Sequence, residues 1–140
     1  MAIYINRIEI HDMESDEATV SGFIDGRQPA GTFTLKVAVQ VFGGAGVGPD
    51  GADEGSMARG QATVTLNGSQ VDFKVTGVKI YEIKAGTTDR FKAGEQAAVT
   101  ISVTDAAGSS VASDSWGGRI QTDDPHIHFD RYGQAHRTAF

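Results

Sequence analysis

The stretch TFTLKVAVQVF, residues 32–42, decides the fold class of this chain. Its side chains alternate, and one face carries the apolar residues Phe33, Leu35, Val37, Val39 and Val41. Polar and small residues dominate the other face. Successive side chains of a β-strand point to opposite sides of a sheet, so a period of two residues is typical of a half-buried strand. The stretch therefore predicts a long strand with one face in a hydrophobic core.

Similar patterns extend outward from this strand in both directions. Further strands are predicted at residues 18–24, 61–66, 71–75, 77–84, 96–104 and 110–121. Residues 3–10 also alternate, but the phase slips by one residue at Asn6 and Arg7, which predicts a β-bulge. Asn67 and Gly68 separate two of the strands and predict a hairpin turn. Residues 86–96 connect two of these predicted strands, and a short helical turn is an alternative structure for them.

About eight short strands separated by turns are typical of an antiparallel sandwich or a barrel. We favour the sandwich, because each strong strand has one apolar and one polar face, and two sheets can bury their apolar faces against each other. The prediction is an all-β, antiparallel β-sandwich domain over residues 1–121. It carries a long Gly-rich loop at residues 42–60, and an extended C-terminal arm follows at residues 122–140.

The composition narrows the classes of function. The chain has 140 residues, which suits one domain, and it has no cysteine, so disulfides, thiolate metal sites and cysteine nucleophiles are excluded. Its formal charge is −6 and no basic stripe is present, so we expect neither nucleic acid nor anionic membrane as a partner. The N-terminal MAIYINR lacks the pattern of a signal peptide, so we expect synthesis in the cytoplasm.

The segment AAVTISVTDAAGSSVAS, residues 97–113, resembles the last hairpin of bacterial and phage immunoglobulin-like domains. In such a hairpin Asp105 would cap the turn and Gly108 would take the left-handed conformation. The resemblance implies an Ig-like sandwich without enzymatic activity, used as a spacer, an adhesin or a decoration of phage heads and tails. The implied partners are proteins, either further copies in a homo-oligomer or a capsid or tail lattice, with the chain incorporated into a virion.

The Gly-rich loop FGGAGVGPDGADEGSMARG, residues 42–60, is a candidate contact surface. No helix start or lysine follows its glycines, as a phosphate cradle would need, and its acids lack the one-residue alternation of an EF-hand. Loops longer than about 12–15 residues are often functional. We expect this loop to contact a partner through Val47, Asp50, Asp53 and Met57.

The C-terminal segment HIHFDR, residues 126–131, is the second candidate. As an extended strand it places His126, His128 and Asp130 on one face, a ligand set that suits Zn²⁺, Ni²⁺ or Fe²⁺. No other cofactor is expected. The opposite face carries the apolar side chains of Ile127 and Phe129, which are costly to leave in water. This favours an arm that lies on its own domain or on a neighbouring subunit. The expected contact residues of the arm are Ile127, Phe129, Arg131, Tyr132 and Phe140.

Two hypotheses of function follow from these features. The chain contains no GxSxG or HExxH motif, so we predict a non-enzymatic structural or interaction module that self-assembles or docks on a larger assembly. The alternative is a carbohydrate- or metal-binding sandwich. Trp116, the only tryptophan, is interpreted as a packed residue beside Gly117 and Gly118, with sugar stacking as its alternative role.

Overall fold

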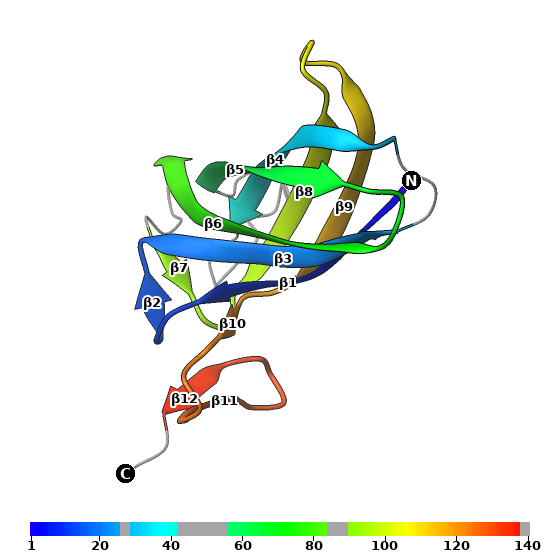
Figure 1. Ribbon diagram of the computed structural model, residues 1–140. Helices are drawn as coiled ribbons and strands as arrows, with labels where there is room; N and C mark the ends of the chain where they lie inside the picture. Colours follow the sequence, from blue (N-terminus) through cyan, green and yellow to red (C-terminus); the bar gives the residue numbers. More distant parts are fainter. Residues whose placement is uncertain (26–28, 42–55, 84–89, 138–140) are drawn as a thin grey trace.

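The computed structural model describes residues 1–25, 29–41, 56–83 and 90–137, and over these residues the protein is all-β (Figure 1). Its strands are β1 (Ala2–Ile10), β2 (Glu14–Ser15), β3 (Glu17–Asp25), β4 (Gly31–Val41), β5 (Ser56–Leu66), β6 (Val71–Glu82), β7 (Phe91–Lys92), β8 (Gln96–Thr104), β9 (Ser110–Arg119), β10 (Gln121–Thr122), β11 (Ile127–Phe129) and β12 (Ala135–Arg137). In these ranges we find no helix long and apolar enough to cross a membrane. The predicted all-β class is confirmed.

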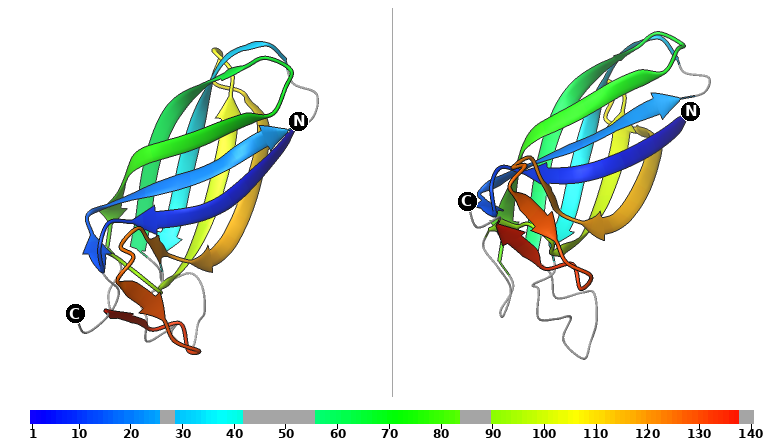
Figure 2. Two further views of the ribbon diagram at one scale, coloured as in Figure 1. Left: turned by 60° about the horizontal axis from the view of Figure 1, so that its bottom comes forward. Right: turned by 90° about the horizontal axis from the view of Figure 1, so that it is seen from below.

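Eight of the strands form one hydrogen-bonded sheet in the order β10-β1-β3-β6-β5-β4-β8-β9. All its neighbours are antiparallel except β1 and β10, which run parallel. The sheet curls until β1 lies beside β9 (Figure 2). The sequence predicts two packed sheets, whereas eight of the described strands form one curled sheet, and β2 with β7 and β11 with β12 form two small separate pairs. A strand with one apolar face fits both arrangements. When one sheet curls, the apolar faces of its two halves come together, just as those of two packed sheets do.

The core lies inside the curl and follows the predicted alternation. From β4 the side chains of Leu35, Val37, Val39 and Val41 are buried, and the paired strand β8 adds Val99, Ile101 and Val103. In β1 the isoleucines at positions 3, 5, 8 and 10 are all buried. The register of β1 against β3 shifts between Ile5 and Arg7, so the predicted β-bulge is confirmed.

Two predicted turns are also confirmed. At the β5–β6 hairpin Gly68 has a φ of 85°, and Asn67 Oδ1 accepts a hydrogen bond of 3.0 Å from the backbone N–H two residues later. At the β8–β9 hairpin Asp105 Oδ1 accepts bonds from the N–H groups two and four residues later, each at 3.0 Å. Gly108 there has a φ of 84°. Both turns combine a side-chain acceptor with a left-handed glycine.

Some predicted boundaries are wrong. Strand β5 begins at Ser56, so residues 56–60 belong to a strand rather than to the Gly-rich loop, because they pair in register with the end of β4. The two strands predicted at 71–75 and 77–84 are one strand, β6, which ends at Glu82 and continues through Gly77 with a φ of 67°; residue 84 lies outside the described residues. In place of the helical turn considered for residues 86–96, residues 90–95 form β7 and a turn, and residue 96 begins β8. Residues 86–89 lie outside the described residues.

Candidate functional site

The C-terminal segment turns back on itself instead of running on as one extended arm. Strands β11 and β12 pair antiparallel, with Ile127 opposite Arg137 and His128 opposite His136. Asp130 closes the turn, because its Oδ1 accepts backbone N–H groups at 2.8 and 2.9 Å, and Gly133 takes a φ of 80°. We call residues 127–137 the C-terminal hairpin. It lies beyond β10 at one end of the curled sheet (Figure 1).

The domain boundary predicted at residue 121 falls inside β10, which pairs with β1 through Gln121 and Thr122. From there the chain stays tied to the end of β1. The Thr122 hydroxyl donates a hydrogen bond of 2.7 Å to the carbonyl of Asp12, and the N–H of Asp123 donates one of 3.1 Å to the carbonyl of Ile10. The segment therefore leaves the sheet gradually, with its backbone held to β1.

The C-terminal hairpin packs closely on the turn before β8. Gly94 has a φ of 92°, and a Cβ added there would overlap the Gly133 carbonyl oxygen and touch the Phe129 ring at 3.4 Å. Arg119 lies against Gly133 and donates a hydrogen bond of 3.2 Å to the carbonyl of Tyr132. Only glycine, which has no Cβ, allows this approach at Gly94.

Charged groups hold the second strand of the hairpin. The Arg137 guanidinium pairs with Asp12 and, at 3.0 Å, with Asp124. The bond to Asp12 raises the pKa of Arg137. The backbone N–H of His126, followed by the Arg137 guanidinium, lowers the pKa of Asp124. The contact with Asp12 ties β12 to the bend that follows β1, 125 positions away in the chain.

In the folded hairpin the residues of the predicted metal set, His126, His128 and Asp130, each have other neighbours, and metal binding by them stays a prediction. His128 and His136 face each other across the hairpin with ring centroids 6.2 Å apart. Asp130 bonds to His136 at 2.8 Å, which lowers the pKa of Asp130. The N–H of His126 donates to Asp124 at 2.9 Å. Within the described part of the chain no three His, Asp or Glu side chains gather so that they could hold a metal ion.

The predicted contact residues of the arm divide between two sides of the hairpin. Ile127 is 8% exposed and Phe129 is half-buried, so both face their own domain, while His128 is exposed. Tyr132 is 65% exposed, and the Arg131 guanidinium lies 4.8 Å from its ring centroid. Phe140 lies outside the described residues. The hairpin thus has a side packed on the domain and a side exposed to solvent.

The other predicted sites lie elsewhere. Val47, Asp50 and Asp53 are outside the described residues, and Met57 is half-buried in β5. The Trp116 ring packs against the core edge and covers Gly118, as the packed interpretation expects. Sugar stacking on Trp116 stays a prediction.

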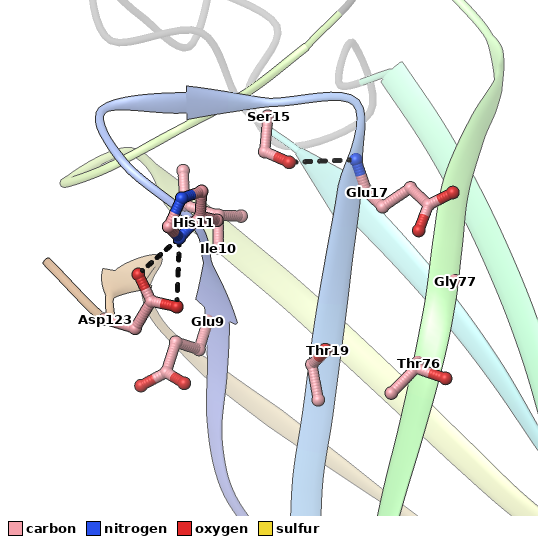
Figure 3. Close-up of a pocket in the computed structure, with 9 residues that line it drawn as sticks. All are labelled: Glu9, Ile10, His11, Ser15, Glu17, Thr19, Thr76, Gly77 and Asp123. Carbon is pink, nitrogen blue, oxygen red and sulfur yellow. Dashed lines mark hydrogen bonds and ion pairs between the residues drawn. The ribbon is translucent and has the colours of Figure 1, made fainter.

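A shallow polar pocket, which the sequence did not indicate, lies over β1, β3 and β6 (Figure 3). The His11 Nδ1 atom lies 3.0 and 3.2 Å from the carboxylate oxygens of Asp123. Glu9 and Glu17 also line the pocket. Glu9 pairs with Arg7 at 3.1 Å, and Glu17 pairs with Lys79 at 3.0 Å. Its acids are therefore individually paired. The 112 positions between His11 and Asp123 explain why no sequence motif marks it.

Glu95, in the turn between β7 and β8, is the second feature that the sequence did not indicate. Its side chain is 7% exposed, and neither carboxyl oxygen has a hydrogen-bond partner. Burial raises its pKa to about 7, Lys92 opposes this rise and Glu14 adds to it. The Glu95 carbonyl accepts a hydrogen bond of 2.8 Å from the N–H of Ile120, which fixes the turn to the strand beside it.

No protein-family model, no curated protein and no solved structure matches this chain. Its most distinctive arrangement is the C-terminal hairpin, docked on the domain through Gly94 and Arg119 and exposed at Tyr132.

Proposed function

We propose that this protein is a non-enzymatic structural module that associates with protein, in the first place with further copies of itself, through the C-terminal hairpin. The observation that carries the proposal is the two-sided hairpin. One side is held on the domain at Gly94 and Arg119, and the other presents Tyr132, 65% exposed, beside Arg131. Tyrosine and arginine are enriched among residues that dominate interface energies.

Docking of the hairpin lowers the entropic cost of this association. A free arm would lose conformational entropy when a partner ordered it. Here the contacts of Arg119 and Arg137 hold the backbone and the second strand before any partner arrives. Tyr132 and Arg131 are therefore presented on a surface that is already ordered, which favours a higher affinity for a given buried area.

The finer version of the proposal is an Ig-like sandwich used as a head-decoration or tail protein of a virion. The resemblance of residues 97–113 to phage immunoglobulin-like hairpins supports it, as does the turn made by Asp105 and Gly108. The two halves of the curled sheet, β10-β1-β3-β6 and β5-β4-β8-β9, bury one shared core, as the layers of a sandwich do.

Size-exclusion chromatography with light scattering tests the proposal. The full chain is expected to form an oligomer, and the double variant Arg131→Ser/Tyr132→Ser is expected to shift it toward monomer. Tyr4→Ser is the matched control, since Tyr4 is 48% exposed but lies in β1, stacked on Phe23. A wild-type chain that stays monomeric at every concentration, or an oligomer that the double variant leaves intact, would refute the proposal.

A further inference from the structure

A hollow on the outer face of the sheet gathers positive charge in this acidic chain. It is lined by Lys36 and Val37 of β4 and by Arg59, Gly60 and Gln61 of β5. Lys36 and Arg59 point outward, because their neighbours Val37 and Ala58 are buried in the core. The chain as a whole carries a formal charge of −6, so two adjacent unpaired cations on one face stand out from their surroundings.

Arg59 is held in place by an aromatic ring. Its guanidinium lies 4.5 Å from the ring centroid of Tyr81 on β6. Such a cation–π contact restrains the guanidinium and leaves its edge of N–H donors available for a ligand. Within the described ranges neither the Arg59 nor the Lys36 side chain has an ion pair or a hydrogen bond. The Arg59 guanidinium is therefore held in place while its N–H donors have no acceptor among the described residues.

The neighbouring strand adds to the positive charge instead of cancelling it. Arg59 stands directly opposite Lys79 in the β5–β6 register, and like charges in such a pair are unfavourable. Lys79 has its own partner, Glu17, at 3.0 Å. No described carboxylate forms an ion pair with Arg59, so the repulsion favours an anion brought by another molecule.

We propose that this hollow binds a carboxylate side chain of an acidic peptide segment in a partner protein. The edge of the Arg59 guanidinium receives the two carboxylate oxygens, because the planar fork of arginine matches a carboxylate. Lys36 is a diagonal neighbour, since it pairs with Gln61 while Arg59 pairs with Ala38. Its ammonium therefore supplies a second charge at short range.

Apolar side chains beside the hollow favour a peptide over a small inorganic anion. Tyr81 is 51% exposed and Ile83, two residues further on, is 60% exposed. Tyr81 lies against Arg59 and offers contact to a non-acidic side chain next to the bound carboxylate, which a phosphate ion cannot use. This surface involves other residues than the C-terminal hairpin, so the inference stands apart from the proposed self-association.

Isothermal titration with a capped hexapeptide of alternating glutamate and leucine tests the inference on the full chain. Binding is expected at low salt and is expected to weaken with ionic strength. Arg59→Gln removes a bidentate, charge-assisted bond, so it is expected to weaken binding by about tenfold or more. Lys36→Gln is expected to weaken it by a smaller factor.

Lys74→Gln is the matched control, because Lys74 is an exposed lysine of β6 that does not line the hollow. It is expected to bind as the wild type does, and circular dichroism checks that each variant keeps its strands. The inference is overturned if the peptide does not bind, if Arg59→Gln and Lys36→Gln both bind unchanged, or if inorganic phosphate binds as tightly as the peptide.

Discussion

Replacing Glu95 with glutamine is expected to stabilise the protein at neutral and alkaline pH. Glu95 is 7% exposed, and its carboxyl oxygens make no hydrogen bonds. The neutral amide of glutamine has nearly the same shape and loses no contact that the carboxyl makes. It also cannot ionise, so it removes the cost of a buried charge.

The pKa of Glu95 sets the size and the sign of the effect. Burial raises this pKa from 4.5 to about 7, which at roughly 1.4 kcal/mol per pKa unit amounts to about 3 kcal/mol. Since the folded state keeps its proton where the unfolded state has lost it, the contribution of Glu95 is fully present below pH 4.5 and is lost as pH rises through about 7. The glutamine variant should therefore exceed the wild type by up to about 3 kcal/mol near pH 8, and match it near pH 4.

Urea denaturation of both proteins across this pH range measures the difference in free energy of unfolding. Other titrating groups largely cancel in that difference. Glu17→Gln is the control, because the Glu17 carboxylate is exposed and pairs with Lys79. If the difference between Glu95→Gln and the wild type is the same at both ends of the range, the burial argument is refuted. A Glu95 carboxyl that titrates near 4.5 by NMR would refute it as well.

Three further outcomes are expected. Gly94→Ala should destabilise the protein in urea by more than Gly108→Ala, because both have a positive φ but only Gly94 would overlap the C-terminal hairpin; the left-handed strain alone costs about 1 kcal/mol. Equal losses would contradict the docking of the hairpin. Below the ordinary Asp pKa of 3.8, NMR should show the hairpin loosening, since the bond from His136 lowers the pKa of Asp130 and its stabilisation is lost as pH falls through that lowered value. Asp130→Asn should abolish this step, and an unchanged acid transition in that variant would exclude Asp130 as its cause. Gly22→Ala should cost about 3 kcal/mol or more in thermal unfolding, because the added Cβ overlaps a backbone carbonyl of β1, and a loss below about 1 kcal/mol would show that β1 can move aside.

The sequence predicted part of the candidate site. It marked residues 126–131 as a candidate site, and it placed Ile127 and Phe129 on the face opposite His128, as the structure has them. It did not predict the hairpin, although Asp130 and Gly133 are the residues that a tight turn uses. Reading the segment as one strand put His126, His128 and Asp130 together. The turn at Asp130 instead directs that carboxylate to His136.

By itself the sequence determined where the long strands lie, the bulge in β1 and the two Gly turns, because each depends on neighbours within a few residues. The two-residue period shows which face of a strand is apolar, but it does not show which strand covers that face. Only the tertiary structure decided that a single sheet curls around the core and that Arg137 pairs with Asp12. It also decided that Glu95, an ordinary turn residue by sequence, is buried without a partner. Such contacts join distant parts of the chain, so local periodicity carries no record of them.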